Sequence, residues 1–217
     1  MSKYVVVDLE MCRTPKGTKK GSLLLKNELI QIGAVLLNKN FETVDSFMTY
    51  VAPEYSRINP FIQKLTGISQ KDLAGAPKFK TAIELFAEWL PVDAEVIAWS
   101  DNDACQIRSE MEYKNITVQN ISVDKWTDCQ KTFSEKMHTE KVYRLSEALS
   151  IADIYYDEDF HDALVDAQNT ALLFAKMQRE DKLVLNPYYA TVIISEETTY
   201  NTFANLLGNY RYATTLV

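Results

Sequence analysis

The helix predicted from residue 162 to about residue 179 constrains this chain most, because apolar side chains cover nearly all of its faces. A helix of this kind is buried, since a surface helix keeps one polar face. Asp166 falls on the same stripe as Leu173 and Met177. An unpaired charge among core residues would cost several kcal/mol, so the fold must place a compensating group beside Asp166.

The remaining elements alternate between strands and helices. Residues 5–8, 29–37 and 41–51 are predicted strands, and three early strands in succession suggest an antiparallel meander. A short helix after Pro60 ends at Thr66-Gly67, and residues 69–72 look like the capped start of another. Further on, we predict helices over 79–90, 101–113, 128–137 and 145–152, and strands over 95–99 and 121–126. The strand-to-helix unit near residue 100 is typical of parallel pairs, so the pattern predicts an α/β fold.

The length of 217 residues and the apolar content of 47% suffice for one domain with a full core. We place this domain at residues 1–185 and a C-terminal extension at 186–217, with the boundary marked by Pro187. Aromatic residues in the extension indicate that it docks on something. Three interpretations stay open: a homodimer contact, a cap on the edge of the domain, or both.

Charge and cysteine content narrow the class of protein. The net charge of -7 argues against nonspecific coating of nucleic acid, but a nuclease that grips phosphates through bound cations remains possible. One basic segment contains no acid and includes Arg13, Lys16, Lys19, Lys20 and Lys26. It is either a solvated flexible loop or a guide for substrate.

Three cysteines far apart favour reduced thiols over a disulfide framework or a zinc site. The N-terminus has no charged leader before a long apolar run, and no apolar stretch reaches the roughly 18 residues of a membrane span. We therefore expect a soluble protein of the cytoplasm that has no membrane partner.

Two acids are predicted to share one face of the first strand. Asp8 and Glu10 are two residues apart, so their side chains point the same way while Leu9 points into the core. Such a triplet is weak evidence alone, because roughly one would occur by chance in so acidic a chain. A surface or helix-capping role is the alternative. The run of three valines before Asp8 strengthens the evidence for a functional site, since a carboxylate there needs a partner, a solvated cleft or a cation.

A third acid is predicted at the start of the helix near residue 101. Asp103 lies one and two turns before Ile107 and Met111, hence on the inward face. Asp101 aligns instead with the outer face and suits a helix cap. Asp103 is therefore the candidate ligand and Asp101 the structural residue.

The two histidines have different surroundings. His161 comes just before the last helix, about one turn from Asp166, where its ring can turn toward whatever Asp166 holds. A structural or merely exposed role is the alternative. His138 stands among charged residues and is predicted to be solvated.

Together these residues form an ordered set: Asp-x-Glu on the first strand, Asp at a strand-to-helix junction, and His-x4-Asp at a late helix. In this order the chain resembles the DEDDh group of 3′-to-5′ exonucleases, within the DnaQ-like superfamily, over residues 3 to about 180. The stretch from Trp99 to Asp103 resembles the form found in sporulation-inhibitor-like and histone-mRNA exonucleases, with Ser100 in place of the usual glycine. Leu65-Thr66-Gly67-Ile68 is similar to the family's Thr-Gly-Ile segment. Cys12 departs from the small hydroxyl residue common at its position.

The resemblance implies an RNase H-like fold, with a mixed central sheet of about five strands flanked by helices. It implies removal of nucleoside 5′-monophosphates from a free 3′ end. Two Mg²⁺ or Mn²⁺ ions, about 4 Å apart, would bind to Asp8, Glu10, Asp103 and Asp166. His161 would act as the general base beside Glu10, the other residue expected to be catalytic. Substrate contacts are expected from Leu9, Met11, Thr66 and Trp99.

Substrate and alternatives stay open at this stage. A single strand is expected because a terminal nucleotide must be splayed into a pocket, and we favour RNA slightly over DNA. One rival is a binding or regulatory module that holds a nucleic-acid end without cleaving it. The other is a phosphodiesterase of small nucleotides.

Overall fold

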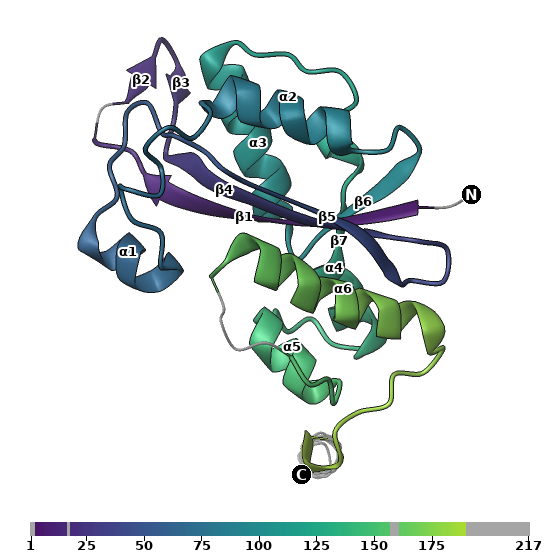
Figure 1. The fold of residues 1–217 in the computed structure, drawn as a ribbon. Helices are drawn as coiled ribbons and strands as arrows, with labels where there is room; N and C mark the ends of the chain where they lie inside the picture. Colours follow the sequence, from purple (N-terminus) through teal and green to yellow (C-terminus); the bar gives the residue numbers. More distant parts are fainter. Residues whose placement is uncertain (1–2, 17, 157–160, 190–217) are drawn as a thin grey trace, which may run out of the picture.

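The computed structural model describes residues 3–16, 18–156 and 161–189, which form a mixed sheet between two layers of helices (Figure 1). The sheet has five strands in the order β5-β4-β1-β6-β7. This confirms the predicted α/β class and the mixed five-stranded sheet.

The three early strands form the predicted antiparallel meander. They are β1 (Lys3–Arg13), β4 (Asn27–Leu37) and β5 (Thr43–Tyr50). The shorter β6 (Ala94–Ala98) pairs parallel with β1, and β7 (Thr127–Asp128) pairs parallel with β6. Because β1 is longer than predicted, Asp8 and Glu10 lie inside the strand rather than at its end.

Helices cover both faces of the sheet. One face carries α2 (Phe79–Trp89) and α3 (Asp101–Lys114), while the other carries α4 (Cys129–Lys136), α5 (Leu145–Ile151) and α6 (Ala163–Arg179) (Figure 1). Each face has its own apolar cluster, because successive residues of β1 point to opposite sides: Val6 to the α6 side, Val5 and Val7 to the α2 side. The short α1 (Pro60–Thr66) begins at the Asn59 cap and ends at the left-handed Gly67, as its Pro and Gly predicted.

Two predicted elements are wrong. Residues 69–72 form a turn in which the Ser69 amide and hydroxyl both donate to Asp72, and the left-handed Gly75 followed by Pro77 leaves no room for a helix. Residues 121–126 contain the 3-10 turn η1 (Val123–Lys125) instead of a strand. Their apolar side chains pack on the α2 and α3 layer, so burial, and not sheet pairing, explains them.

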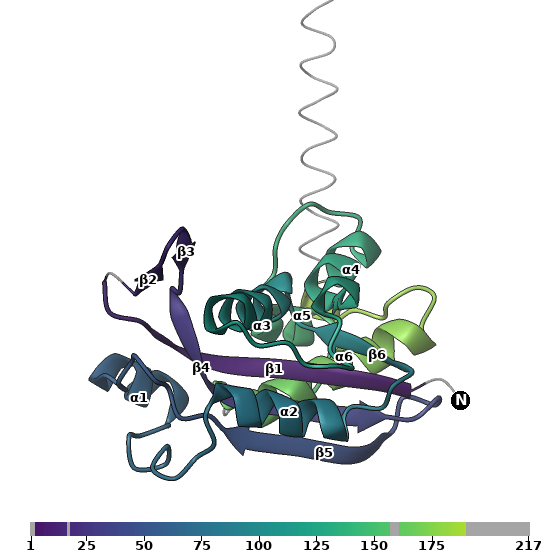
Figure 2. The same cartoon turned by 90° about the horizontal axis from the view of Figure 1, so that it is seen from above.

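The basic segment contains a structured hairpin that projects from the sheet, formed by β2 (Lys19–Lys20) and β3 (Leu23–Leu24) (Figures 1 and 2). Its base is closed by a hydrogen bond from the Thr14 amide to the Lys26 carbonyl at 2.9 Å, and Leu25 is buried beneath it. Lys19 and Lys20 are exposed. The basic side chains are therefore displayed on an anchored element.

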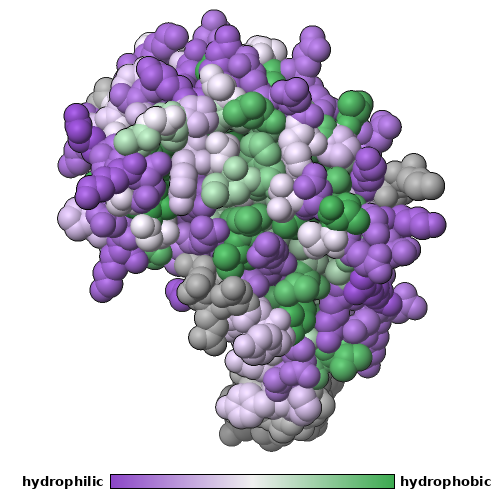
Figure 3. All heavy atoms as spheres, viewed as in Figure 1, coloured by the Kyte–Doolittle hydropathy of each residue, from purple (hydrophilic) through white to green (hydrophobic). Residues whose placement is uncertain are grey.

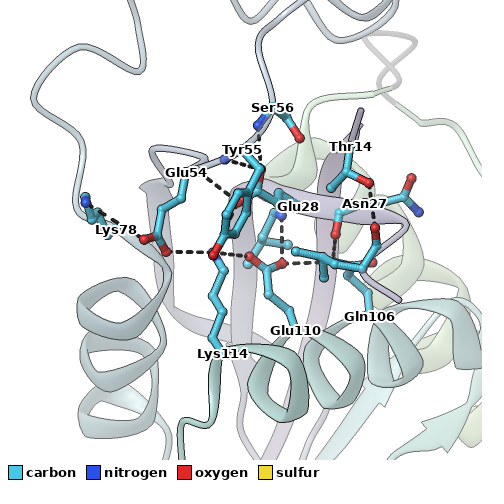
Figure 4. Close-up of polar contacts among 12 residues, drawn as sticks. Thr14, Asn27, Glu28, Glu54, Tyr55, Ser56, Lys78, Gln106, Glu110 and Lys114 are labelled. Atoms are coloured by element: carbon cyan, nitrogen blue, oxygen red, sulfur yellow. Dashed lines mark hydrogen bonds and ion pairs between the residues drawn. The ribbon is translucent and has the colours of Figure 1, made fainter. Parts of the chain in front are cut away.

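A second group of charges, which we call the charge cluster, fixes the far end of α3 (Figure 4). It consists of Glu28, Glu54, Glu110 and Lys114. The Lys114 ammonium lies 3.2 Å from Glu28, 2.9 Å from Glu54 and 2.9 Å from Glu110. Glu110 also accepts a hydrogen bond from the Leu29 amide of β4, so the cluster ties α3 to the sheet.

Apolar side chains gather in a band on the face of the molecule seen in Figure 3. Exposed apolar residues also occur on the edge strand β5, at Val44 and Met48. Among the described helices, none is long and apolar enough to cross a membrane. Residues 190–217, which hold most of the predicted extension and its proposed dimer contact, lie outside the described residues, so the boundary near residue 185 stays a prediction.

Candidate active site

The middle of β1 carries the first two acids. Asp8 and Glu10 point toward the α6 layer, and their partners across the β1–β4 ladder are Gly33 and Gln31. The ladder shifts register directly after Glu10. Such irregularities often adjoin active sites, because they redirect the side chains beside them.

The start of α3 supplies the third acid. Asp103 is buried, as its place on the inward face predicted. The predicted cap is wrong by one residue: Ser100 is the N-cap and accepts a hydrogen bond from the Asn102 amide, while Asp101 is already helical and exposed. Asp103 lies close enough to β1 to accept a hydrogen bond from the Leu9 amide.

The entrance to α6 supplies the last two side chains. Asp162 is the N-cap and accepts hydrogen bonds from the Leu164 amide at 2.9 Å and the Val165 amide at 3.2 Å. His161 has a left-handed φ of 73°, and its amide donates to Asp166 Oδ2 at 2.9 Å. The other oxygen, Asp166 Oδ1, is buried and has no hydrogen-bond partner among the described residues.

These elements bring the predicted residues together. Ligand atoms of Glu10, His161 and Asp166 all lie within 4.8 Å of one another. They line a cavity of about 660 Å³ together with Asp8. Asp103 does not line the cavity, but its charge acts on both Asp8 and Glu10. His138 is exposed at the end of α4 and takes no part.

Burial and mutual repulsion act in the same direction on these acids. Burial, together with the charges of Asp166 and Asp103, raises the pKa of Glu10 to about 8. Burial also raises the pKa of Asp103 to about 7, against hydrogen bonds from its own amide and from Leu9. The pKa of Asp8 is raised well above its ordinary value by burial and then by the charges of Asp103, Asp166 and Glu10. Burial raises the pKa of Asp166 as well, although the His161 amide opposes it.

The arrangement fits divalent cations. Hard carboxylate oxygens are the ligands that Mg²⁺ and Mn²⁺ prefer, and a cation would satisfy the unpartnered Asp166 Oδ1 while removing the repulsion that raises these pKa values. No ion pair joins the four acids to a lysine or arginine within the described part of the chain. The site therefore has the donors for cations and, among the residues that the structure describes, no basic side chain that takes their place.

The predicted substrate contacts divide into two groups. Leu9 and Trp99 line the cavity. Met11 and Thr66 do not, and the Thr66 hydroxyl is engaged with the Ile62 carbonyl at 3.0 Å and the Ile68 amide at 3.1 Å. Contacts of these two residues with a bound strand stay a prediction.

Sequence reasoning missed part of the cavity lining, which comes from α4 and from the residues around the start of α5. Its residues include Gln130, Tyr143, Arg144 and Ser146. Arg144 is the one lysine or arginine among the described residues that line the cavity. The position of Arg144 just before the apolar face of α5 offered a local signal of a helix start, but not of a substrate contact.

Comparison with known proteins gives a family match over most of the chain. The profile of the RNase T family, described as exonuclease, matches residues 5–174. The chain is 30% identical over 176 residues to the DNA polymerase III PolC-type of Caldanaerobacter subterraneus subsp. tengcongensis, covering 81% of this chain and 11% of the relative. It is 29% identical over 202 residues to human ERI1 exoribonuclease 2, covering 81% of this chain and 28% of the relative. The chain thus spans less than a third of either relative.

The fold has matches among solved structures. The nuclease domain of 3′hExo, a DEDDh family member bound to rAMP, superposes with a TM-score of 0.67 at 21% identity, over 85% of this chain and 96% of that one. A full-length 3′-exonuclease superposes with a TM-score of 0.69 at 20% identity, over 85% of both chains. At this level of identity the likeness shows a shared fold.

Proposed function

Because this chain belongs to the RNase T exonuclease family, with its acids and histidine in the DEDDh order, we propose that it is a 3′-to-5′ exonuclease. It would release nucleoside 5′-monophosphates from single-stranded nucleic acid. One observation carries the proposal: Glu10, His161 and Asp166, from two distant parts of the chain, meet within 4.8 Å in a cavity that Asp8 also lines.

Asp8, Glu10, Asp103 and Asp166 would hold two divalent cations, Mg²⁺ or Mn²⁺. Such ions, when bound, lower the pKa of water and neutralise charge that develops on the phosphate and the departing oxygen. The fit rests on the carboxylate donors and on the buried Asp166 Oδ1 that lacks a partner among the described residues.

His161 would accept the proton of the attacking water at a ring nitrogen. The water oxygen forms a bond to phosphorus, and the bond between phosphorus and the 3′ oxygen of the preceding nucleotide breaks. The phosphate stays on the released nucleotide, and the departing 3′ oxygen takes a proton from solvent, so the shortened strand ends in a new 3′ hydroxyl. His161 is exposed beside the buried Glu10 and Asp166, so it is accessible to water and to substrate.

Arg144 would bind a phosphate of the strand upstream of the scissile bond. The strand must cross a cavity rich in carboxylates, and among the described lining residues only this one offers a permanent positive charge. No ion pair occupies its guanidinium within the described residues, so it is available to a phosphate. Leu9 and Trp99 supply apolar contacts to the terminal nucleotide.

We favour RNA slightly over DNA as substrate, because the human relative is an exoribonuclease by name. The bacterial relative is a DNA polymerase, so both substrates belong in the test. We also propose that the basic hairpin guides the nucleic-acid strand, since it comes shortly after β1, which carries Glu10, and displays exposed Lys19 and Lys20. We further propose a cytoplasmic location and a homodimer that forms through the C-terminal extension.

The test is cleavage of single-stranded RNA and DNA labelled at the 5′ end, with Mg²⁺, with Mn²⁺ and with a chelator. The proposal predicts a ladder that shortens from the 3′ end and stops in chelator. His161→Ala should lower kcat by about 10²- to 10⁴-fold, because the general base is lost, with an unchanged unfolding midpoint. His138→Ala, which removes the other histidine, exposed and outside the cavity, is the matched control.

Three outcomes would separate the alternatives. Stabilisation by metal with no cleavage of any strand would favour a binding module. Cleavage confined to dinucleotides would favour a phosphodiesterase of small nucleotides. A full rate in His161→Ala would show that the assigned base is wrong.

A further inference from the structure

We propose that Gln31 is a positioning residue for this site: with Asp162 it holds the first turn of α6 so that His161 and Asp166 face Asp8 and Glu10. The inference deepens the proposed function and rests on it. Gln31 itself is fully buried on β4 and would touch neither substrate nor cation.

Both polar atoms of the Gln31 side chain are engaged at the start of α6. Nε2 donates to Asp162 Oδ2 at 3.0 Å, and Oε1 accepts from the Ala163 amide at 3.1 Å. A carboxylate only accepts and an amide N–H only donates, so the orientation of the side chain is fixed. Buried hydrogen bonds of this kind hold their partners in one geometry, because leaving either group unpaired costs about 1–3 kcal/mol.

The contact reaches the catalytic side chains through Asp162. Its second oxygen, Oδ1, caps α6 through the Leu164 and Val165 amides, and its carbonyl accepts from the Asp166 amide at 2.9 Å. His161 precedes Asp162 directly, in a left-handed conformation that a residue other than glycine adopts only when its surroundings impose it. A shift of the cap would therefore move both His161 and Asp166.

We call the contact of Gln31 and Gly33 with the first turn of α6 the helix seat. The register of β4 explains why the helix seat sets the geometry of the site. Gln31 stands opposite Glu10, and Gly33 stands opposite Asp8. At Gly33 the first turn of α6 lies directly on the strand: a Cβ there would come within 2.2 Å of the Ala163 carbonyl carbon and of the Leu164 nitrogen. The two β4 residues that face the acids of β1 are thus the two that seat the helix carrying Asp166.

The helix seat also holds α6 against the electrostatic repulsion between its acids and those of β1. Asp162 and Asp166 lie among the charges that act on Asp8 and Glu10, so the entrance of α6 is pushed away from β1 when the acids are ionised. Gln31 brings a neutral donor to Asp162 and a neutral acceptor to Ala163, which ties the helix to the strand without adding charge.

A reciprocal exchange tests this pair. In Gln31→Glu a carboxylate oxygen faces Asp162 Oδ2. In Asp162→Asn the new side-chain oxygen caps α6, so its NH2 group faces the NH2 group of Gln31, and each single variant sets two acceptors or two donors against each other. In the double variant the carboxylate introduced at position 31 can accept from both the Ala163 amide and the new side-chain amide at position 162, whose oxygen can still cap α6. The pair then keeps its total charge and both of its hydrogen bonds.

The measurements are kcat and KM on a single strand, and the rise in unfolding midpoint that Mn²⁺ produces. We expect each single variant to lower kcat by about 10- to 100-fold with little change in KM, as for a misplacement of reacting groups by about 1 Å. The rise produced by Mn²⁺ should shrink in parallel, and the double variant should recover both quantities to within a few-fold. Gln119→Glu, which adds the same charge at an exposed position, should change neither.

Full kcat and full Mn²⁺ response in both single variants would overturn the proposal. So would a double variant whose losses are the sum of the single losses. If Gln31→Glu does not fold, Asp162→Asn and the double variant still decide, because folding and activity of the double variant would itself be the rescue. If the wild type cleaves nothing, the proposed function fails. The Mn²⁺ response of the wild type, the two single variants and the double variant would still show whether the contact between Gln31 and Asp162 positions the site.

Discussion

Two groups of acids, most of them buried, lie near opposite ends of α3, and they differ in what neutralises them. Near the end of the helix, Lys114 lies within 3.2 Å of three glutamates in the charge cluster (Figure 4). Near its start, Asp103 joins Asp8, Glu10 and Asp166, and no ion pair to a lysine or arginine is found there among the described residues. The same fold therefore contains one compensated group and one that is not.

The pKa values follow this difference. Burial alone would raise the pKa of Glu28, but hydrogen bonds from Glu54, Ser56 and Tyr55 and the charge of Lys114 hold it below its ordinary value. Glu110 keeps a raised pKa, because burial outweighs Lys114. All four acids of the active site have raised pKa values. Buried carboxylates alone thus do not indicate a metal site, whereas buried carboxylates that converge without a protein partner do.

The largest effect on stability is expected from removing the positive charge of Lys114 from the charge cluster. Lys114→Met should lower the free energy of unfolding by about 3–5 kcal/mol, because it leaves Glu28 and Glu110 buried without their counter-charge. Urea unfolding measures this loss. Lys80→Met, which breaks an exposed pair with Glu84, is the control and should cost about 0.5 kcal/mol or less. Equal effects of the two substitutions would show that the cluster is not a buried ion pair.

A smaller effect is expected from pH in the metal-free protein. A raised pKa means that the folded state binds more protons than the unfolded state, so stability falls as pH rises from the ordinary value of 4.5 through the folded value of about 8 for Glu10. At about 1.4 kcal/mol for each pH unit the full loss over this window would be about 5 kcal/mol, and water in the cavity, which screens the charges, should reduce the observed loss to on the order of 3 kcal/mol. Glu28 acts in the opposite sense: its lowered pKa stabilises the fold above 4.5, and that contribution is lost on acidification.

Urea unfolding in chelator across this range should therefore show highest stability near pH 5 and a decline toward pH 8. Mn²⁺ should abolish the decline at pH 8 and have little effect at pH 5, where Glu10 and Asp103 are protonated. A stability that rises steadily from pH 5 to pH 8 in chelator would contradict the uncompensated state of the site.

The smallest expected effect is a gain in the stability of the metal-free protein. Glu10→Gln should raise the stability of the metal-free protein at pH 8 by about 1–2 kcal/mol, since it removes one of the repelling charges. The same substitution should remove most of the stabilisation by Mn²⁺. Thermal unfolding with and without the ion measures both changes. A loss of stability without metal would place Glu10 in a favourable interaction and weaken the contrast between the two acid groups.

Sequence patterns predicted the parts of the site that depend on periodicity within one element. The common face of Asp8 and Glu10, the inward face of Asp103 and the buried stripe of Asp166 follow from strand and helix repeats, and the structure places them so. The roles of these residues came from the family order rather than from periodicity.

Contacts between distant elements were not predictable. Gln31 pairs with Asp162 across 131 positions, and Glu28 with Lys114 across 86, so no local pattern relates them. Residues 121–126 mimic a strand because their apolar side chains cover α2 and α3, and the hairpin at Lys19 depends on a base closed between Thr14 and Lys26. In each case tertiary packing decides the local structure.

The contrast between the two groups of acids rests on the proposal that the uncompensated acids hold divalent cations. A crystal of the protein grown with Mn²⁺ and measured by anomalous scattering tests it most directly. We expect two peaks at the carboxylates of Asp8, Glu10, Asp103 and Asp166, and both peaks should disappear in Glu10→Gln. If Mn²⁺ bound only at surface acids and left these carboxylates free, the assignment of a metal site to the uncompensated acids would be wrong.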